Sequence, residues 1–367
     1  MNKISVLADQ ALQPGSGHRI PSKAYYDADW QDRETKELFE KVWNFAGVVT
    51  DIPNPGDYLT LKVGRAPILV VRDRENKIRA FHNFCRHRGA QLLDGNGHCA
   101  TISCPYHAWN YGLDGQLRKV PHHEEQFADM KLEDWPLLPA ACDIHAGMIF
   151  VNVTEAPTPL SEWLGDLGEF LNQYDLSKLV ELQTIEYPLK SNWKYFVENH
   201  IDWLHLFYLH AKTLNMYDHT KGHWAQCGDH WMGFEVPEPT KAEDIVKRQE
   251  GFLPIEGIEP GEGRYGAHLL FPNLPLVTSD KSFVIMELKQ DGPTRSTLHI
   301  RTFAQEGSVL PDTRKEDSEV MKEDQLAAER LQMAVASPFT EVGPLALEYE
   351  SPITEFHDAY LRYVSLS

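Results

Sequence analysis

Two motifs that pair a cysteine with a histidine carry the clearest chemistry in this sequence. The first is a Cys-x-His motif at Cys85 and His87, and the second is a Cys-x2-His motif at Cys104 and His107. Two thiolates on one iron and two imidazoles on the other are the ligands of one kind of 2Fe-2S cluster. The same four side chains would also suit a tetrahedral structural zinc ion. The spacing therefore predicts a metal centre and leaves two metals to be distinguished.

The residues around these motifs bear on the choice of metal. The first motif lies in CRHRGAQLLDG and the second in CPYHAWNYGLDG, and both segments resemble the cluster loops of Rieske iron-sulfur proteins. This resemblance implies a 2Fe-2S cluster and makes a zinc site the less favoured alternative. The other three cysteines are Cys99, Cys142 and Cys227. We interpret them as ordinary packed thiols.

A second set of candidate ligands lies in residues 192–210, NWKYFVENHIDWLHLFYLH, within the pattern E-N-x2-D-x2-H-x4-H. The pattern contains Asn199, Asp202, His205 and His210. Two histidines and one carboxylate form the facial triad that binds Fe(II) and leaves positions for dioxygen and substrate. His205 and His210 are therefore predicted iron ligands, and the third ligand must come from another segment. Asn199 is a further candidate catalytic residue.

The spacing of these residues sets a geometric condition. A straight α-helix would separate His205 from His210 by about 140° around its axis and about 7.5 Å along it, so both rings could not reach one ion. We therefore expect the helix to end near His210 or to contain a wider turn between the two histidines. Asp202 precedes His205 by three positions, so the two should meet on one helix flank. There Asp202 would accept the outer N–H of His205 and orient the ring.

The missing carboxylate is predicted on a helix that covers residues 317–336, DSEVMKEDQLAAERLQMAVA. Wound at helical spacing, this segment has one mostly apolar stripe, which consists of Val320, Asp324, Ala327, Leu331 and Val335. An acid in the middle of an apolar face is costly to bury unless it is paired or binds a metal. Asp324 is therefore the predicted third ligand, in preference to Glu323 at the edge of the stripe. A carboxylate paired with a buried Arg or Lys is the alternative.

The composition indicates a globular protein that does not bind nucleic acid. The chain has 367 residues, of which 42% are hydrophobic and 24% charged, and this length favours two or three domains. A formal net charge of -19 disfavours nucleic acid as a partner, because it would repel phosphates. No apolar run approaches about 18 residues and no signal peptide is recognisable, so we expect a cytoplasmic protein and no membrane contact. Five cysteines without a regular framework argue against structural disulfides.

The periodicity of the sequence changes along the chain and indicates three parts. Residues 30–45 have apolar side chains at helical spacing, and we assign 1–45 to an N-terminal helical segment. Short strand patterns such as DYLTLKV and GMIFVNV then indicate a small all-β domain at residues 46–154, which contains both Cys/His motifs. Residues 155–367 form a second, larger domain.

The larger domain combines helices with longer strands. Residues 161–174 have a helical pattern behind a Ser161 cap, and strand-like runs lie near residues 182, 282 and 296. This pattern predicts an antiparallel sheet packed with helices. Residues 237–265 are rich in Pro, Gly and Glu, and we expect there a long excursion that could cover an active site.

Together, these motifs resemble the oxygenase component, or α subunit, of the Rieske non-heme iron oxygenases. The likeness rests on the two Cys/His motifs, the pattern at residues 198–210, the turn at residues 271–274 and the pair Glu323 and Asp324. It implies an α+β fold, with a small all-β Rieske domain and a helix-grip, START-like catalytic domain that has an antiparallel sheet and helices. It also implies that residues 1–45 pack on the catalytic domain.

The resemblance assigns a role to each candidate residue. Cys85, His87, Cys104 and His107 would hold the 2Fe-2S cluster. His205, His210 and Asp324 would hold a mononuclear Fe(II), and Asp202 would form the bridge for electrons between the two centres of neighbouring subunits.

The resemblance also implies the partners of the reaction. Electrons from NAD(P)H would arrive through a separate reductase, with or without a ferredoxin, because the sequence has no nucleotide-binding glycine motif. Dioxygen and a small organic substrate would be the other reactants, and the reaction would be hydroxylation or oxidative demethylation. A chain of 367 residues is short for family members that have a β subunit, so a homotrimer of α chains is expected.

The substrate remains open between two classes. The spacing around Asp202 resembles family members that act on aromatic acids and ethers. The Glu323–Asp324 helix and the closing EFHDAYLRYV resemble members that act on quaternary ammonium compounds. Two other functions are also kept: a Rieske electron carrier, and a helix-grip ligand-binding module with a structural metal. Iron content separates them, since the oxygenase should hold about three irons per chain, the carrier about two and the binding module none.

Overall fold

The computed structural model describes residues 17–215, 217, 219–224, 228–236, 251–258, 265–310, 315–340 and 343–365. The chain divides into two compact units. The first, named the β unit, consists of Thr35–Trp163 and Asp175–Ser177; the second, named the mixed unit, consists of Met1–Glu34, Leu164–Tyr174 and Lys178–Ser367.

The division of the chain differs from the expected boundaries at residues 45/46 and 154/155. The β unit begins at Thr35, inside the segment assigned to the N-terminal part, and extends to Trp163. One reason is a contact of Trp43, whose Nε1 donates to the carbonyl of Thr158 at 2.9 Å. This hydrogen bond keeps the proline-containing segment after residue 154 with the β unit.

The β unit is built on an antiparallel sheet with strand order β1-β10-β9-β4-β3-β2-β5. Its strands are β1 (Asn44–Val48), β2 (Asp57–Val63), β3 (Ala66–Arg72), β4 (Ile78–His82), β5 (Gly97–His98), β9 (Pro139–His145) and β10 (Met148–Asn152). A smaller sheet of β6 (Ile102–Ser103), β7 (Asn110–Tyr111) and β8 (Leu117–Lys119) carries the second Cys/His motif. Two short α-helices also occur here: α2 (His123–Gln126), and α3 (Leu160–Leu164), whose last residue belongs to the mixed unit.

The two sheets of the β unit share a buried core beneath the Cys/His motifs. Cys85 and Cys104 belong to this core, together with Trp109, Tyr111 and Leu137. Strand β3 is buried at Ile68–Val71, as expected for a strand with apolar contacts on both faces. The core therefore supports the loops that hold the candidate cluster ligands.

The mixed unit contains a second antiparallel sheet, with strand order β11-β17-β16-β15-β14-β13-β12. Its strands are β11 (Val180–Leu189), β12 (His223–Trp224), β13 (Trp231–Val236), β14 (Tyr265–Leu270), β15 (Leu274–Thr278), β16 (Ser282–Gly292) and β17 (Arg295–Ala304). The strand-like runs predicted near residues 182, 282 and 296 correspond to β11, β16 and β17.

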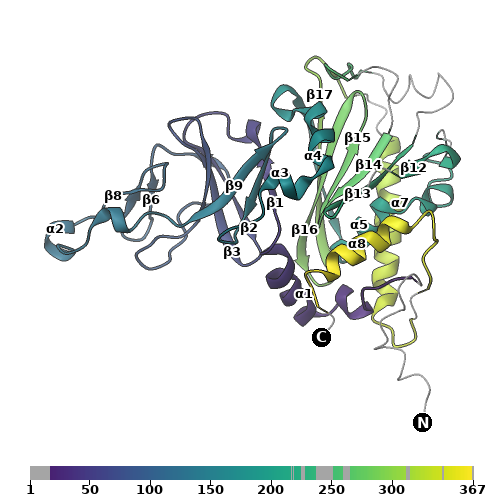
Figure 1. The fold of residues 1–367 in the computed structure, drawn as a ribbon, viewed down its shortest axis with the longest axis horizontal. Coiled ribbons are helices and arrows are strands. Elements are labelled where there is room, and N and C mark those ends of the chain that lie inside the picture. Colours follow the sequence, from purple (N-terminus) through teal and green to yellow (C-terminus); the bar gives the residue numbers. More distant parts are fainter. Residues whose placement is uncertain are drawn as a thin grey trace, which may run out of the picture. The chain divides into compact units, whose positions relative to one another are not determined.

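Helices cover both faces of this sheet. Figure 1 shows α5 (Trp193–Ile201), α7 (Lys315–Val335) and α8 (Ser351–Leu361) on one side of the strands. On that side, Ala267 of β14 packs against Trp203 and Leu206. The next residue, His268, points to the opposite face because side chains alternate along a strand. There the His268 ring lies 4.8 Å from the ring of Phe170 on α4 (Asp166–Leu171).

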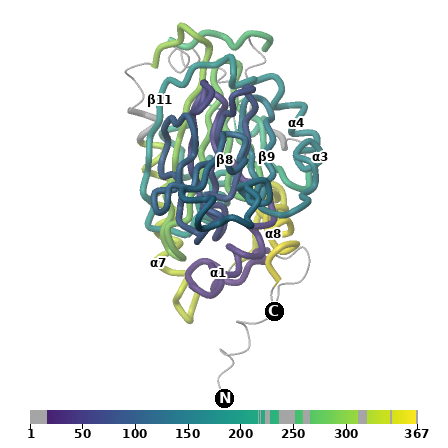
Figure 2. The backbone as a smooth tube through the Cα atoms, turned by 90° about the vertical axis from the view of Figure 1, so that its left-hand side faces the viewer, coloured from purple at the N-terminus to yellow at the C-terminus, as the bar shows by residue number. Residues whose placement is uncertain are grey.

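A buried ion pair holds helix α5 against the N-terminal segment. Lys194 Nζ contacts Glu34 Oε1 at 2.5 Å, and both side chains are fully buried. Tyr360 on α8 also donates to Glu34, and Trp30 on α1 (Ala28–Glu34) donates to the Tyr360 oxygen at 2.7 Å. Helices α1 and α8 accordingly lie close to each other in Figures 1 and 2. A buried charge needs such a set of partners, because its desolvation is costly.

Two predicted helices are interrupted. The helix expected over residues 30–45 ends at Glu34, a π-helical turn follows at Thr35–Phe39, and Phe45 lies on β1, where it pairs with Phe150. The pattern failed here because aromatic residues at helical spacing also suit a buried strand. The helix expected over residues 161–174 is split into α3 and α4 at Gly165, which has a φ of 54°, a conformation that ends helices.

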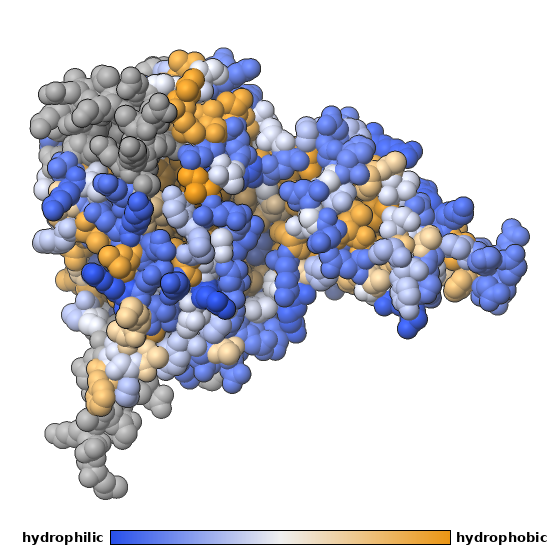
Figure 3. All heavy atoms as spheres, turned by 180° about the vertical axis from the view of Figure 1, so that it is seen from behind, coloured by the Kyte–Doolittle hydropathy of each residue, from blue (hydrophilic) through white to orange (hydrophobic). Residues whose placement is uncertain are grey.

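The predicted fold class is confirmed, with an all-β unit and a separate antiparallel sheet packed with helices. Of the predicted excursion at residues 237–265, residues 237–250 and 259–264 lie outside the described part of the chain, and so does Cys227. Within the described ranges, no helix is both long and apolar enough to cross a membrane. The face of the molecule in Figure 3 is mostly hydrophilic, with smaller apolar patches between the polar groups.

Candidate metal centres

The two Cys/His motifs form two similar tight loops. The carbonyl of Cys85 accepts the N–H of Gly89 at 2.9 Å, and the carbonyl of Cys104 accepts the N–H of Ala108 at 3.0 Å. In both loops the cysteine is buried and the histidine is partly exposed. The loops meet at their histidines, with His87 Nδ1 and His107 Nδ1 3.1 Å apart. Neighbouring imidazole nitrogens on one side and buried thiols on the other are the arrangement that a 2Fe-2S cluster requires.

The surroundings of the motifs suit metal ligation. The Tyr111 oxygen accepts the N–H of Arg86 at 3.0 Å, so its own proton is free to point to Cys85 Sγ, 3.4 Å away. Such a hydrogen bond to a ligating sulfur is one means of setting a cluster's potential. The His87 ring stacks on Trp109 with 5.0 Å between ring centroids. Burial lowers the pKa of His87, which favours the neutral imidazole that binds metals.

The separation of the four ligands bears on the zinc alternative. Around one tetrahedral zinc, with bonds of about 2.0–2.3 Å, every pair of ligand atoms would lie within roughly 4 Å. Among the described residues, the groups of three or more such atoms within 4.8 Å of one another contain none of the four Cys/His ligands. The two thiols and the two histidines therefore do not converge on a single ion, and they fit a cluster with two irons.

Two of the remaining cysteines also stand in a Cys-x2-His spacing, Cys142 with His145 and Cys227 with His230, and Cys227 lies outside the described residues. Cys142 and His145 both lie on the extended strand β9. Residues three apart on a strand point to opposite faces, so this pair cannot ligate one metal. Cys142 is a free thiol whose pKa is raised to about 12 by burial. The interpretation of Cys142 as a packed thiol agrees with this environment.

The second predicted centre brings three ligands together. One nitrogen of His205, one of His210 and one oxygen of Asp324 all lie within 4.8 Å of one another. Asp324 Oδ1 is 2.9 Å from His210 Nε2 and 3.8 Å from His205 Nε2. Two imidazoles and one carboxylate match the donor set of the facial triad for Fe(II). The residues present therefore fit a mononuclear iron.

The chain leaves the helix before it reaches the two histidines. Helix α5 ends at Ile201, Asp202 has extended backbone angles, and His205 lies in a 3₁₀ turn at Leu204–Phe207. Asp202 Oδ1 initiates this turn by accepting the N–H groups of Leu204 at 2.6 Å and of His205 at 3.3 Å. The helix break anticipated from the histidine spacing is present, but it comes before His205.

The expected contact between Asp202 and His205 arises differently from the prediction. The two residues are not on one helix flank, since the capping turn, and not helical spacing, brings them together. Asp202 Oδ2 is 3.4 Å from His205 Nδ1, and this nitrogen has no hydrogen bond within the described residues. Asp202 Oδ2 therefore remains available to a ring N–H.

Asp324 lies on the buried side of α7, as its position on an apolar stripe predicted. Its exposed fraction is 7%, and Asn199 Nδ2 donates to its Oδ1 at 2.9 Å. Within the described part of the chain, the ionisable groups found next to it are the two histidines, and no Arg or Lys. The stripe itself was partly wrong, because Leu331 is 52% exposed and Ala328 takes its place in the core.

Glu323, the rival for Asp324, lies at the other side of the same histidine. Its Oε2 is 2.8 Å from His210 Nδ1, whereas Asp324 faces Nε2 of that ring. Thr213 also donates to Glu323 Oε2, at 2.6 Å. Sequence reasoning missed Thr213, and its distance of three residues from His210 is the signal that could have drawn attention to it.

A third histidine beside this centre, His200, was not anticipated. It lies on α5, and its Nε2 is 3.0 Å from the carbonyl oxygen of His268. Burial lowers the pKa of His200 to about 4, so the ring is neutral. Because a carbonyl only accepts, Nε2 carries the proton and is not a metal ligand in this arrangement.

Comparison with known families agrees with both centres. The Rieske 2Fe-2S domain family matches residues 42–137. The catalytic domain of the ring-hydroxylating α subunit matches residues 176–366, which is more than half of the chain. The chain belongs to the ring-hydroxylating α-subunit family. It is a Rieske oxygenase, an oxidoreductase that combines a 2Fe-2S cluster with a non-heme iron and takes its electrons from a separate reductase.

Similar proteins act on two kinds of substrate. The oxygenase subunit of glycine betaine monooxygenase from Chromohalobacter salexigens is 29% identical to this chain. The similarity covers 96% of this chain and 87% of the length of that subunit. The α subunit of 2-aminobenzenesulfonate 2,3-dioxygenase from Alcaligenes is 33% identical, over 56% of this chain and 54% of its own. The structure of the quaternary ammonium Rieske monooxygenase CntA with L-carnitine has a TM-score of 0.78 at 21% identity, over 98% and 99% of the two chains. The last comparison shows a common fold.

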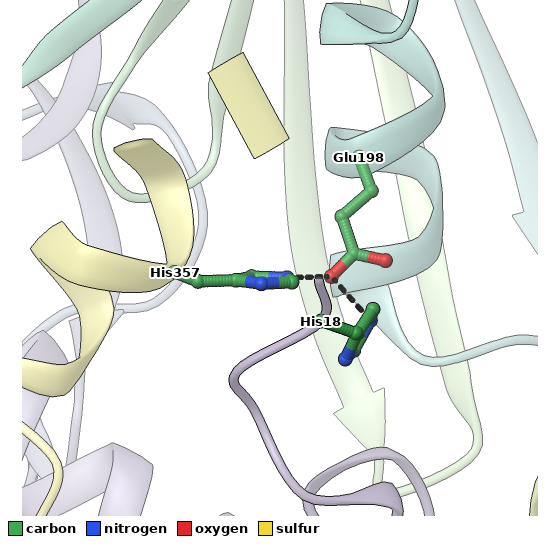
Figure 4. A group of neighbouring side chains, drawn as sticks. All are labelled: His18, Glu198 and His357. Atoms are coloured by element: carbon green, nitrogen blue, oxygen red, sulfur yellow. Dashed lines mark hydrogen bonds and ion pairs between the residues drawn. The ribbon is translucent and has the colours of Figure 1, made fainter. Parts of the chain in front are cut away.

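The mixed unit of this Rieske oxygenase has another group of potential metal ligands, besides His205, His210 and Asp324. Figure 4 shows His18 from the N-terminal segment, Glu198 from α5 and His357 from α8, with both histidines directed to one oxygen of Glu198. His357 Nε2 is 3.0 Å from Glu198 Oε1, and Tyr25 donates a short hydrogen bond to the same oxygen. Burial alone would raise the pKa of Glu198, but hydrogen bonds from His18 and His357 lower it far below its usual range.

The protons of this group leave no place for a metal. The backbone N–H of Arg19 donates to His357 Nδ1 at 3.2 Å, so Nδ1 carries the lone pair. Burial lowers the pKa of His357 to about 4, so the ring is neutral and its single proton is on Nε2. Nε2 therefore donates to Glu198 and cannot bind a metal. The group is a hydrogen-bonded anchor that ties the N-terminal segment and α8 to α5.

Proposed function

We propose that this Rieske oxygenase is a monooxygenase that acts on a small quaternary ammonium compound. The observation that carries the proposal is the extent of similarity to glycine betaine monooxygenase, which covers 96% of this chain and 87% of that subunit. Similarity to the aromatic 2-aminobenzenesulfonate dioxygenase covers only 56% of the chain. The substrate pocket draws on residues from many parts of a catalytic domain, so similarity along the whole chain is the better guide.

The geometry supports the proposed assignment of ligands. In this proposal Cys85, His87, Cys104 and His107 hold the cluster in a Rieske domain at residues 46–154. His205, His210 and Asp324 hold Fe(II) in a catalytic domain at residues 155–367. With the iron bound, this centre would supply the activation of dioxygen, using electrons that arrive through the cluster.

The neighbouring side chains prepare the iron ligands. Asn199 donates to Asp324 Oδ1 and thereby restrains the carboxylate. The Asp202 cap directs the chain so that His205 turns to the same point as His210. Insertion of one oxygen atom into a C–H bond consumes two electrons and two protons, and the second oxygen atom leaves as water. The protein must therefore deliver electrons and protons, besides holding the substrate.

Asp202 is the proposed bridge for electrons between subunits. Its Oδ1 is taken by two backbone N–H groups, which leaves Oδ2 for imidazole N–H groups. We propose that Oδ2 accepts from His205 and from His107 of a second copy, within a homotrimer. A carboxylate oxygen has two lone pairs and can accept both. The structure of CntA reveals insights into inter-subunit electron transfer in that protein, which supports the proposal.

The chemistry of a quaternary ammonium group suits the surroundings of the iron ligands. Such a cation has no N–H to donate and is recognised by the faces of aromatic rings. Leu206 follows His205 in the chain, and Leu214 N donates to the carbonyl of His210. Both leucines belong to one apolar cluster. Its aromatic members are Trp203, Phe207, Tyr217, Phe234, Tyr265 and Tyr349. We propose that this cluster offers aromatic faces to a methylammonium group.

An aromatic acid is the second candidate. It is favoured by the 33% identity to the 2-aminobenzenesulfonate dioxygenase subunit, which is the higher identity although over a shorter stretch. Aromatic rings stack on the same aromatic faces, so the aromatic cluster does not separate the two classes.

A substrate-dependent oxygen-uptake assay tests the proposal. The purified protein, with a reductase as electron donor, would be given glycine betaine, choline and carnitine, and in parallel 2-aminobenzenesulfonate and anthranilate. Oxygen uptake matched by an oxygenated or demethylated product with a quaternary ammonium compound is the expected result. Product from an aromatic acid alone would overturn the proposed substrate class. Hydrogen peroxide must be measured in the same assay, because uncoupled uptake is not turnover.

A further inference from the structure

We propose that Glu323 is a positioning residue for the iron ligand His210, and that Thr213 holds Glu323 in place. The inference rests on the proposed assignment of His210 to the iron. It gives separate roles to two adjacent acids on α7, one as a ligand and the other as the partner of a ligand.

The first observation is the position of the His210 ring between two carboxylates. Its Nε2 lies 2.9 Å from Asp324 Oδ1 and its Nδ1 lies 2.8 Å from Glu323 Oε2. The ring is 1% exposed, so water does not compete for either nitrogen. Consecutive side chains on a helix point about 100° apart, so two adjacent acids can reach opposite edges of one ring that lies across the helix.

The second observation is the hydrogen bond from Thr213. Its Oγ1 donates to Glu323 Oε2 at 2.6 Å, the same oxygen that faces the ring. Thr213 and His210 lie in one turn, which the hydrogen bond from Leu214 N to the carbonyl of His210 closes at 2.9 Å. A partly exposed glutamate has many rotamers, and the threonine selects the one that reaches His210. Thr213 therefore acts on the iron ligand through Glu323.

The consequence for a metal follows from the protons of the ring. With a metal ion on Nε2, the His210 ring keeps its one proton on Nδ1, and the carboxylate of Glu323, which only accepts when ionised, takes that N–H. This is the tautomer in which Nε2 can bind a metal ion. A carboxylate behind a ligating histidine also raises the basicity of the ring and fixes its orientation.

The other iron histidine is held differently. His205 Nδ1 faces Asp202 Oδ2 at 3.4 Å, without a hydrogen bond within the described residues. The two histidines therefore differ in restraint. His210 is the fixed ligand, held by Glu323, while the outer nitrogen of His205 stays close to Asp202, the residue proposed to bridge the two centres.

The experiment compares iron binding in matched variants. Glu323→Gln keeps the size and a carbonyl oxygen but removes the charge, and Thr213→Val removes the hydroxyl but keeps the shape. Glu319→Gln is the control, because it makes the same change at an exposed position on the same helix. The affinity for Fe(II) would be measured by competition with a chelator, together with the EPR spectrum of the nitric oxide adduct and the melting temperature of the iron-free protein.

The expected result is a loss of iron affinity of about ten- to a hundredfold in Glu323→Gln and a smaller loss in Thr213→Val. The EPR signal should shift in both, while the control, the cluster spectrum and the melting temperature of the iron-free protein stay unchanged. If the melting temperature of the iron-free variant fell as much as that of the iron-loaded variant, Glu323 would have a merely structural role, and the inference would be overturned. Unchanged affinity and EPR signal in Glu323→Gln would also overturn it.

Two further outcomes separate this inference from the proposed function. Complete loss of the mononuclear iron in Glu323→Gln, with full retention in Asp324→Ala, would make Glu323 the ligand and overturn the positioning role. A wild-type protein that binds iron only in its cluster would overturn the proposed function, and this inference with it.

Discussion

The side-chain amide of Asn199 donates to Asp324 Oδ1 at 2.9 Å and so joins helix α5 to helix α7 at the candidate iron site. The same oxygen lies 2.9 Å from His210 Nε2. Asn199 therefore restrains the carboxylate that completes the triad, although it has no ligating role of its own. Two segments that are far apart in the sequence meet at this one oxygen.

Replacement of Asn199 tests this restraint. Asn199→Ala leaves Asp324 free to rotate, so the affinity for Fe(II) should fall by roughly tenfold, at the lower end of the effect of losing a partner of a ligand. The cluster should keep its visible spectrum, because its ligands belong to the β unit. Iron titration of the variant measures the change. An affinity equal to that of the wild type would show that Asp324 does not need this partner.

The cluster ligands are tested by replacing one thiol. Cys104→Ser should abolish the visible absorption of the 2Fe-2S centre, because serine does not supply the soft thiolate that iron-sulfur clusters require. Cys99→Ser is the matched control, since Cys99 is a half-buried thiol outside the two motifs and should affect packing alone. A normal Rieske spectrum in Cys104→Ser would remove Cys104 from the ligands.

The fold could be predicted from the sequence where one signal dominates. Alternating apolar residues marked β2, and strand-like runs marked β11, β16 and β17. Prediction failed where the same spacing of apolar residues fits both a helix and a strand. Phe45 fits the spacing of a helix, but in the structure it pairs with Phe150, and no local signal reports that distant partner.

The convergence of His205, His210 and Asp324 could be predicted from the sequence, and the side chains around them less so. Asp324 was selected because an acid on an apolar stripe is costly to bury without a partner or a metal. Its neighbour Glu323 appeared only as a rival, because helical winding does not show which nitrogen of His210 each acid would face. The group of His18, Glu198 and His357 was missed altogether. It joins three distant parts of the chain, and only the folded structure brings them together.

Buried histidines should make the stability of the protein fall at acidic pH. Burial lowers the pKa of His268 to about 3 and of His357 to about 4, so both are neutral in the fold. Unfolded histidines take up protons near pH 6.5. Their contribution to stability is therefore complete above that pH and is lost as pH falls from about 6.5 to about 4 for His357 and to about 3 for His268, at up to about 1.4 kcal/mol per pH unit for each histidine.

His268→Phe isolates one of these contributions. Neither ring nitrogen of His268 has a hydrogen bond within the described residues, and the ring packs beside Phe170. A phenylalanine should therefore be tolerated at pH 7, within about 1 kcal/mol. Urea unfolding at pH 7 and pH 5 should show a smaller loss of stability in the variant than in the wild type. An identical loss would mean that His268 is not a buried neutral ring.

Asp202→Asn tests the proposed bridge. Asparagine caps a turn as well as aspartate does, so the hydrogen bonds to Leu204 and His205 should survive. Its amide nitrogen would replace Oδ2 and face the N–H of each ring, where it cannot accept. The variant should therefore keep both metals, while its chemically reduced cluster fails to reoxidise with substrate and dioxygen. Loss of the mononuclear iron would instead show that Asp202 serves only to hold His205.

A single-turnover experiment on the wild type and Asp324→Ala tests the central claim, that the 2Fe-2S cluster and the mononuclear iron of this protein act together. The variant should contain about two irons per chain and the wild type about three, because the variant loses a ligand of the mononuclear iron and keeps all four ligands of the cluster. After chemical reduction and removal of the reductant, both would be mixed with a quaternary ammonium substrate and dioxygen. The account predicts rapid reoxidation of the cluster with formation of oxygenated product in the wild type, and a cluster that stays reduced without product in Asp324→Ala. Equally fast reoxidation and equal product in the variant would contradict it.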